Sequence, residues 1–272
     1  MTVRWYINIK EEFILKKVAF ITGGGGYIGG ETAFTLSRAG FKVAVCDLNE
    51  AAIDKTVARI KEAGGEAKGY IGDVTDPKNI ESVMRQAVSD LGTLGAMVHV
   101  AGGSARIAGK DATPLPLVEQ EEQVIDTVLK VNLFGAFWAS RAAAKIMMDQ
   151  RDGGKIVNFS SVVAYNGLSG FCDYAASKGG VISLTKALAK ELGPYKINVN
   201  SVAPGVVCRD EVDTTTEEGH HYAYETNVLG KKCTASDIAN VVEFLVSDKS
   251  NFVTGQVYVC DGGRSLSMKG SD

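Results

Sequence analysis

The sequence predicts an α/β fold: a doubly wound parallel sheet of about seven strands with helices on both faces. Short apolar runs alternate along the chain with longer stretches of helical periodicity, which is the pattern of repeated βαβ units. The apolar runs are continuous and do not alternate with polar residues, so the strands are expected to be buried on both sides. Together these two observations favour a parallel sheet that is covered by helices.

The expected elements follow one another in a regular order. The strands are expected at 18–22, 42–46, 67–71, 96–100, 155–159, 197–202 and 256–259. The helices are expected at 27–39, 50–63, 77–91, 118–150, 173–192 and 235–247. No linker rich in Pro or Ser interrupts this order, so residues 17–263 are expected to form one domain between an N-terminal extension (1–16) and a C-terminal tail (264–272). Residues 206–230 lack clear periodicity and are expected to form a substrate loop.

Composition argues against several classes of protein. The chain of 272 residues is 45% hydrophobic and 22% charged, which is ordinary for a globular protein and too apolar for intrinsic disorder. No apolar run reaches the ~18–20 residues of a membrane span, and the N-terminus lacks the layout of a signal peptide. The net charge of −3, with both signs interspersed, argues against nucleic acid as a partner.

Cysteine and histidine usage argues against disulfides and metal sites. The five cysteines are an odd number without a CxxC pair, which favours a reducing cytoplasm over a disulfide framework or a structural zinc site. A polar cluster of carboxylates and imidazoles lacks the spacing of a metal-ligand motif, so no metal is expected. That cluster consists of Glu217, Glu218, His220 and His221.

A glycine-rich turn follows the first expected strand. It reads TGGGGYIG over residues 22–29 and leads into a helical pattern. Glycines in this position let the backbone turn tightly and approach a pyrophosphate, whose charge is stabilised at the helix N-terminus. The same turn also suits a plain strand-to-helix connection. If a dinucleotide binds here, the contacting residues are expected to be Gly23, Gly26, Tyr27, Ile28 and Gly29.

Residues at the ends of the following strands extend this expected cofactor site. Asp47 ends the second strand, close to the spacing of about 20 residues at which an acid binds the adenosine ribose. Its carboxylate would repel a 2′-phosphate and no Arg or Lys directly follows it, so NAD is favoured over NADP. The simpler alternative for Asp47 is a solvated acid that starts the next helix. Since doubly wound sheets bind ligands at the carboxyl ends of their strands, the further candidates are Leu48, Asp73, Val74, Ala101 and Gly102.

Tyr174 and Lys178 are four residues apart at the start of a helical pattern, which places both side chains on one helix face. A phenol has a pKa near 10, and a nearby ammonium lowers that pKa toward the range useful for proton transfer at pH 7. The same pair also suits an ordinary surface contact. Ser161 follows the strand 155–159 and can hold a substrate carbonyl beside the phenol. Asn132 lies within a helical stretch, where it either orients a water in a proton relay or marks a local kink with its side chain bonded to backbone.

Taken together, these residues resemble the single-domain short-chain dehydrogenases/reductases over residues 17–263. The matching motifs, in chain order, are TG…G at 22–29, Asp47, Asp73-Val74, Ala101-Gly102, Asn132, Ser161, YxxxK at 174–178 and Pro204-Gly205. The resemblance implies a Rossmann-like fold and hydride transfer between NAD(H) and a small secondary alcohol or ketone.

The resemblance also implies roles for individual residues. Tyr174 would be the acid or base, Ser161 would hold the substrate carbonyl, and Asn132 would anchor a proton relay. Lys178 would lower the pKa of the phenol and bind the nicotinamide ribose. The residues expected along the nicotinamide are Pro204, Gly205 and Val207. Because this family usually forms homotetramers, a homo-oligomer, tetramer or dimer, is expected.

The chain departs from the family pattern at three places. Tyr27 occupies the sixth place of the usual TGxxxGxG turn, and the glycine spacing instead fits the TGxxGxxG of an extended branch that includes epimerases. Too few residues follow Lys178 for the substrate domain of that branch, which favours the single-domain type. His99-Val100 replaces the two Asn of the usual NNAG, and His99 is expected to be a core histidine. Arg209 replaces the Thr that often follows PGxxx, so one hydrogen bond to the carboxamide is either absent or made by another group.

Three functions fit these observations. The acidic ribose site and the four expected catalytic residues favour an NAD-dependent dehydrogenase or reductase that acts on a secondary alcohol or ketone. The alternatives are an epimerase or dehydratase that retains NAD, and a non-catalytic regulatory protein that binds NAD. Substrate specificity is expected from residues 103–108, 162–171 and 206–230. Arg106 and Arg209 are either solvated or bind an anionic group of the substrate.

Overall fold

The computed structural model describes residues 17–104, 109, 114–209, 212–221, 225 and 227–266 of the chain. The expected N-terminal extension (1–16) and Arg106 lie outside the described residues. Parts of the expected substrate loop (206–230) and of the expected C-terminal tail (264–272) lie outside them as well.

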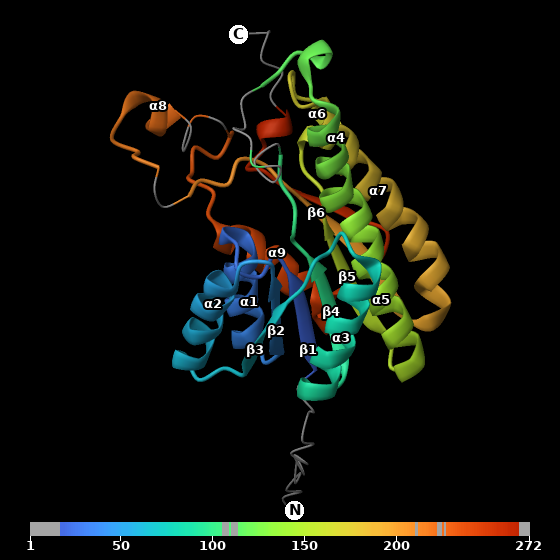
Figure 1. The fold of residues 1–272 in the computed structure, drawn as a ribbon. Helices are drawn as coiled ribbons and strands as arrows, with labels where there is room; N and C mark the ends of the chain where they lie inside the picture. Colours follow the sequence, from blue (N-terminus) through green and yellow to red (C-terminus); the bar gives the residue numbers. More distant parts are fainter. Residues whose placement is uncertain are drawn as a thin grey trace, which may run out of the picture.

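The described residues form a parallel sheet of seven strands in the order β3-β2-β1-β4-β5-β6-β7 (Figure 1). The chain builds the sheet outward from β1 to β3, returns to the centre, and then builds it outward from β4 to β7. The prediction of a doubly wound parallel sheet is therefore confirmed, and β1 and β4 flank its topological switch point. The strands are β1 (Val18–Thr22), β2 (Lys42–Asp47), β3 (Ala67–Ile71), β4 (Leu94–His99), β5 (Gly154–Phe159), β6 (Ile197–Pro204) and β7 (Val257–Cys260).

Burial of the strands follows their place in the sheet. Every residue of β1 and β4 is buried, as expected of central strands that carry helices on both sides. At the sheet edge, β3 buries Ala67 and Tyr70 and exposes Lys68 and Ile71. The continuous apolar runs in the sequence thus mark the central strands, and the mixed pattern marks the edge.

Helices cover the two faces of the sheet in two groups (Figure 1). One face carries α1 (Tyr27–Arg38), α2 (Glu50–Glu62) and α9 (Ala235–Val246), and the other carries α3 (Pro77–Leu91), α5 (Gly135–Gln150) and α7 (Cys172–Leu192). Three further helices, α4 (Glu122–Leu129), α6 (Val163–Asn166) and α8 (Glu217–His220), complete the set among the described residues. Each group buries its own apolar cluster against the sheet.

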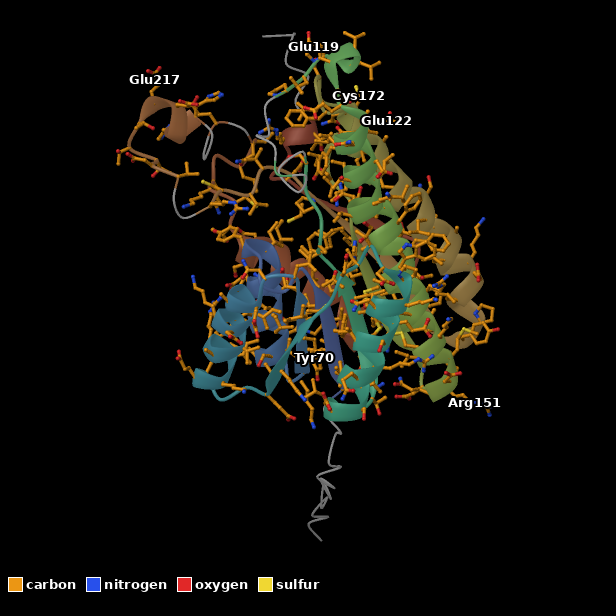
Figure 2. The ribbon with its side chains drawn as sticks, viewed as in Figure 1. Tyr70, Glu119, Glu122, Arg151, Cys172 and Glu217 are labelled. Carbon is orange, nitrogen blue, oxygen red and sulfur yellow. The ribbon has the colours of Figure 1, made fainter. Side chains whose placement is uncertain are left out.

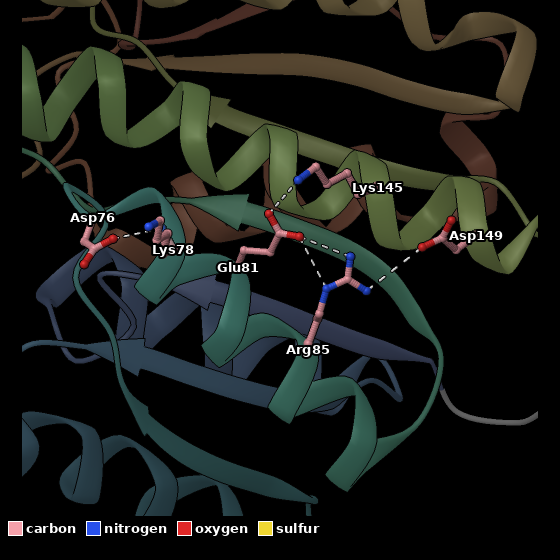
Figure 3. Close-up of polar contacts among 6 residues, drawn as sticks. All are labelled: Asp76, Lys78, Glu81, Arg85, Lys145 and Asp149. Atoms are coloured by element: carbon pink, nitrogen blue, oxygen red, sulfur yellow. Dashed lines mark hydrogen bonds and ion pairs between the residues drawn. The ribbon is translucent and has the colours of Figure 1, made fainter.

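Polar side chains fix the start of α3 and join it to α5 (Figure 3). Asp76 caps α3 by accepting hydrogen bonds from the backbone N–H groups of Lys78 and Asn79, at 2.8 and 3.1 Å. Glu81 of α3 accepts from Lys145 of α5 at 2.8 Å and from Arg85 one turn along α3 at 3.1 Å. These ion pairs are partly exposed, so they add little to stability individually, but they align two helices of the same layer.

The expected helix at 118–150 is interrupted. It begins with a 3₁₀ turn at Leu117–Glu119, continues as α4, passes through a π-helical turn at Lys130–Phe134, and ends as α5. A π turn inside an α-helix often marks a functional position. Asn132, which is a poor helix former, lies in the middle of this turn and is fully buried.

The carboxyl ends of the strands point toward α6 and α8 (Figure 1). Figure 2 places Glu119, Glu122, Cys172 and Glu217 at this end of the molecule and Arg151 at the opposite end. Doubly wound sheets bind ligands at the carboxyl ends of their strands, so a ligand site is expected there. Among the described residues, no helix has the length and apolar character needed to cross a bilayer.

Candidate active site

A cavity of about 180 Å³ lies at the carboxyl ends of β4, β5 and β6. It brings together three of the four predicted catalytic residues, Ser161, Tyr174 and Lys178. Five of the predicted cofactor residues also line the cavity. They come from the start of α1, from the segment after β4, from the end of β6 and from the residues that follow β6. The full lining is Ile28, Val100, Gly102, Gly103, Phe159, Ser160, Ser161, Tyr174, Lys178, Pro204, Gly205 and Val207.

Ser161 and the phenol of Tyr174 lie together on the cavity wall, and the Ser161 side chain acts on the pKa of that phenol. Burial raises the pKa of Tyr174, because it disfavours the phenolate, and the Ser161 side chain acts in the opposite direction. The Ser161 oxygen also accepts from the backbone N–H of Val163 at 3.3 Å, which leaves its own proton to donate to the phenol. Ser161 is therefore held in place to stabilise negative charge on the Tyr174 oxygen.

Lys178 is buried below the cavity, and its ammonium donates to the carbonyl of Phe159 at 2.9 Å. Its Nζ lies 5.7 Å from the centroid of the Tyr174 ring. Burial lowers the pKa of Lys178 from 10.5 to about 8. The hydroxyl of Ser160 donates to the Lys178 carbonyl at 2.9 Å, so α7 is tied to the end of β5 at the point where the ammonium enters the site.

Asn132 lies behind the cavity wall and does not line it. Its side-chain oxygen accepts from the N–H of Gly103 at 2.8 Å, and its amide donates to the Gly103 carbonyl at 2.9 Å and to the Ser177 hydroxyl at 3.0 Å. Both amide hydrogens are used in these bonds. Asn132 thus lies at a local break in the α-helix with its side chain bonded to backbone, which is one of the two alternatives that the sequence left open. Its role as a relay anchor stays a prediction.

The glycine-rich turn packs too tightly for side chains. Gly23 has a φ of 65°, and a Cβ added to it would lie 2.7 Å from the backbone nitrogen of Ala101. A Cβ on Gly29 would collide with the carbonyl of Gly23. The first turn of α1 has no acidic residue and no side-chain cap, so an anion at this helix end would meet the partial positive charge of the helix without a competing carboxylate. A dinucleotide diphosphate fits this arrangement.

Asp47 closes β2 and holds the glycine-rich turn. One carboxylate oxygen accepts from the N–H of Gly25 at 3.0 Å, and the other accepts from the N–H groups of Leu48 and Asn49 at 2.8 and 3.1 Å. Leu48 itself is 67% exposed. Because each carboxylate oxygen can accept more than one hydrogen bond, Asp47 retains capacity for ribose hydroxyls.

The predicted cofactor residues after β3 have mixed environments. Asp73 accepts hydrogen bonds from the N–H and hydroxyl of Thr75 at 2.8 and 2.7 Å, which form a local turn. Val74 is buried, and a Cβ added to Gly135 would lie 2.9 Å from its Cγ2. Val74 therefore packs against the start of α5.

Each of the three departures from the family pattern has a defined place. His99 is fully buried beneath the site, with Nδ1 2.9 Å from the hydroxyl of Thr22, and burial lowers its pKa to about 3, so it is a neutral core histidine. Tyr27 donates from its phenol to the carbonyl of Cys208 at 3.1 Å. The Arg209 guanidinium lies 5.8 Å from the centroid of the Tyr27 ring.

The polar cluster on and after α8 is an exposed group of hydrogen-bonded side chains. His220 and His221 contact the two oxygens of Glu225 at 3.3 and 2.9 Å, and all three side chains are more than half exposed. Within the part of the chain that the structure describes, no three side chains of His, Cys, Asp or Glu are grouped so as to hold a metal ion.

Several contacts that hold the site together were not predicted from the sequence. Phe159 contributes its backbone carbonyl to Lys178, and Gly103 contributes its backbone to Asn132. Ser160 and Ser177 act through hydroxyls that bind neighbouring elements. Only the fold places these groups together, and the adjacent serines at 160–161 are the local pattern nearest to them.

The chain is similar to several known proteins. A family model described as "Enoyl-(Acyl carrier protein) reductase" matches residues 26–265. The 3-oxoacyl-[acyl-carrier-protein] reductase FabG of Thermotoga maritima is 36% identical over 247 residues, which cover 91% of this chain and 97% of that protein. The diacetyl reductase [(S)-acetoin forming] of Staphylococcus epidermidis is 33% identical over 261 residues, which cover 92% and 98%.

Two further relatives extend the comparison. The 2-(S)-hydroxypropyl-CoM dehydrogenase 3 of Xanthobacter autotrophicus is 34% identical over 253 residues, covering 91% of this chain and 96% of that protein. The solved structure of a short-chain type dehydrogenase/reductase from Mycobacterium ulcerans is similar with a TM-score of 0.84 and 29% identity, covering 92% of this chain and 90% of that one. Similarity thus extends over nearly the whole length of both partners.

Proposed function

The chain belongs to the short-chain dehydrogenase/reductase family, and from that membership we propose that it transfers a hydride between NAD(H) and a secondary alcohol or ketone. The observation that carries the proposal is the grouping of Ser161, Tyr174 and Lys178 on the lining of one cavity, with the Lys178 ammonium held by the carbonyl of Phe159. The relatives' names describe a reductase of 3-oxoacyl groups, a reductase of diacetyl and a dehydrogenase of a hydroxypropyl group, which share chemistry at a carbonyl or hydroxyl carbon.

The proton chemistry falls to Tyr174. In carbonyl reduction its phenol donates a proton to the substrate oxygen, and in alcohol oxidation its oxygen takes the hydroxyl proton. Ser161 holds the same substrate oxygen by a second hydrogen bond. A bound nicotinamide supplies or accepts the hydride at the substrate carbon. The Lys178 ammonium lies 5.7 Å from the centroid of the Tyr174 ring, where its positive charge would favour the phenolate over the phenol.

We further propose that the dinucleotide lies from Asp47 across the glycine-rich turn to the cavity. The N–H groups at the start of α1 would bind its diphosphate, Asp47 would bind the adenosine ribose, and Gly205 and Val207 would flank the nicotinamide. Asp47 supports NAD over NADP, because its carboxylate is held by three backbone N–H groups at the place where a 2′-phosphate would enter.

The test is turnover with a panel of secondary alcohols and ketones in the presence of NAD(H) and of NADP(H). Tyr174→Phe removes only the phenolic oxygen, so turnover is expected to fall by about 10²–10⁴-fold while the dinucleotide still binds. Tyr195→Phe, at an exposed tyrosine outside the cavity, is the matched control and is expected to behave as the wild type. Equal turnover by the wild type and Tyr174→Phe would exclude the proposed role.

The same assay separates the alternative functions. Tight retention of NAD with no net reduction of added dinucleotide would support an epimerase or dehydratase. Binding of NAD with no turnover across the panel would support a non-catalytic regulatory protein. For the choice of cofactor, Asp47→Ser is expected to raise kcat/KM with NADP relative to NAD, because it removes a like charge from the 2′-phosphate.

We also propose that the chain forms a homo-oligomer through α5 and α7. Phe134 and Phe137 are 47% and 43% exposed at the start of α5, and exposed aromatic pairs of this kind are typical of interfaces. Light scattering after gel filtration measures the assembly. A dimer or tetramer that Phe137→Glu dissociates would support this surface, and a monomeric wild type would contradict it.

A further inference from the structure

The start of α1 is tied to the segment after β6 by a bond particular to this sequence. Tyr27, in the place usually occupied by a small residue of the turn, donates its phenolic hydrogen to the carbonyl of Cys208 at 3.1 Å. Ile28 and Val207, the neighbours of these two residues, both line the cavity. The hydrogen bond therefore spans one edge of the cavity mouth, between two parts of the chain that are 181 residues apart.

This tie fixes the backbone from which Arg209 projects. The N–H of Cys208 donates to the carbonyl of Cys233 at 2.9 Å, and its carbonyl accepts from Tyr27, so both backbone groups of Cys208 are held. The carbonyl of Arg209 accepts from the N–H of Val212 at 3.2 Å. The Arg209 guanidinium then lies over the Tyr27 ring, 5.8 Å from its centroid, within cation–π range.

The charge of Arg209 lies beside a helix end of the same sign. Tyr27 is the first residue of α1, and the first turn of that helix carries no acidic side chain. The N-terminus of a helix has a partial positive charge, so it gives a nearby cation no compensation. Among the residues that the structure describes, no carboxylate forms an ion pair with Arg209, and its side chain is exposed. An anion at this helix end would interact favourably with both the N–H groups and the guanidinium.

We propose that Arg209, held over Tyr27, binds the diphosphate of the dinucleotide opposite the N–H groups of α1. The inference rests on the proposed function. It gives Arg209 a part in cofactor binding that differs from the carboxamide contact of the Thr that the family often has at this position. Guanidinium groups bind phosphate oxygens through paired hydrogen bonds, which suits a diphosphate between the two elements.

The position of Arg209 favours the diphosphate over the two other anions that could reach the site. A 2′-phosphate would lie beside Asp47, on the β2 side of α1, whereas Arg209 comes from the β6 side. An anionic substrate group would enter beside Tyr174, inside the cavity, whereas Arg209 is not among the residues that line it. A diphosphate bound at the start of α1 would lie between these two positions.

The experiment measures binding by calorimetry at low and high salt, with ADP-ribose, 2′-phospho-ADP-ribose and adenosine as probes. Arg209→Met keeps the length of the side chain and removes its charge, so the Kd for ADP-ribose is expected to rise about ten- to hundredfold, with a weaker dependence on salt. Adenosine binding is expected to stay unchanged. Arg209→Lys is expected to recover part of the affinity. Arg38→Met, at an exposed arginine on the opposite end of α1, is the matched control.

Tyr27→Phe provides a second measurement, because it keeps the ring under Arg209 and removes only the hydrogen bond to Cys208. A rise of about fivefold in the Kd for ADP-ribose is expected. Wild-type affinity for ADP-ribose in Arg209→Met would overturn the inference while leaving the proposed function intact. An equal loss of adenosine binding would show a structural effect instead, and a loss confined to 2′-phospho-ADP-ribose would assign Arg209 to a 2′-phosphate. Absence of binding of every probe by the wild type would overturn both the inference and the proposed function.

Discussion

The side-chain amide of Asn132 donates a hydrogen bond to the hydroxyl of Ser177 at 3.0 Å, and that hydroxyl donates in turn to the carbonyl of Tyr174 at 2.7 Å. Asn132 also holds both backbone groups of Gly103. A buried amide in the π turn thus connects the segment after β4 with the first turns of α7. The position of Tyr174 relative to the segment after β4 therefore depends on this amide.

Asn132→Ala is expected to lower the free energy of unfolding by about 2–4 kcal/mol, because it leaves the Gly103 N–H and the Ser177 hydroxyl without their buried partner. Urea denaturation measures the loss. Asn166→Ala, at an exposed asparagine of α6, is the control and is expected to change stability by less than about 0.5 kcal/mol. A double-mutant cycle with Ser177→Ala should give a coupling energy of about 1 kcal/mol, and additive effects would show that the two side chains do not interact in solution.

Burial of Lys178 predicts a pH dependence of stability. Its pKa is about 8 in the folded chain and 10.5 when unperturbed. Between these values the unfolded chain binds more protons than the folded chain, so stability rises as pH rises from about 8 to 10.5 and falls as pH falls through that window. The full contribution is at most about 3 kcal/mol. In Lys178→Met this part of the rise in stability with pH is expected to be absent. Urea midpoints of both proteins at pH 7.5 and 10 measure it. An identical change of stability with pH in the two proteins would contradict the burial of the ammonium.

His99 predicts a loss of stability in acid. Its pKa is about 3 in the folded chain against 6.5 unperturbed, chiefly because burial disfavours the charged ring. The unfolded chain therefore takes up a proton first, and stability that is complete above about pH 6.5 is lost as pH falls toward 3. Between pH 6.5 and 4.5 the loss is expected to be about 2 kcal/mol. His99→Asn, which cannot be protonated in this range, should lose measurably less in the same denaturation series, and an equal loss would refute a role for His99.

Gly102 is expected to tolerate no side chain. An added Cβ would collide with the Asn132 oxygen and would lie 3.2 Å from the Nζ of Lys178. Gly102→Ala should displace the ammonium and reduce kcat by at least about tenfold, since a misplacement of about 1 Å at a site can cost a hundredfold. Gly179→Ala is the matched control, because an added Cβ there meets nothing within 4 Å. It should stabilise α7 by about 0.5–1 kcal/mol and leave turnover unchanged.

The sequence could predict the sheet because the signals for it are local. The buried residues of β1 and β4 are continuous apolar runs, and Asp76 and Pro77 mark the start of α3 in a way that needs no tertiary information. Tyr174 and Lys178 could be chosen because their spacing and the motifs around them are recognisable. All three features are set by neighbours in the chain.

Contacts between distant residues could not be predicted in this way. The bond from Tyr27 to Cys208 depends on the place of α1 beside the end of β6, which no local pattern records. The π turn has no composition of its own, and the periodicity of 118–150 predicted one uninterrupted stretch. The backbone carbonyl of Phe159 that receives the Lys178 ammonium is invisible in a sequence, because every residue has a carbonyl.

The π turn also sets how the side chains of α4 are rotated about the helix axis relative to those of α5. A π-helical turn holds one more residue than an α-helical turn, and one residue corresponds to about 100° around the axis. The stripe of side chains on α4 is therefore turned relative to the stripe on α5, and α4 packs chiefly on α7 while α5 packs chiefly on α3 and β4. Removing one residue from Lys130–Phe134 would restore a uniform α-helix. The side chains of α4 that contact α7 would then face away from it. The extra residue thus lets α4 and α5, which follow each other directly in the chain, pack against neighbours that lie in different directions.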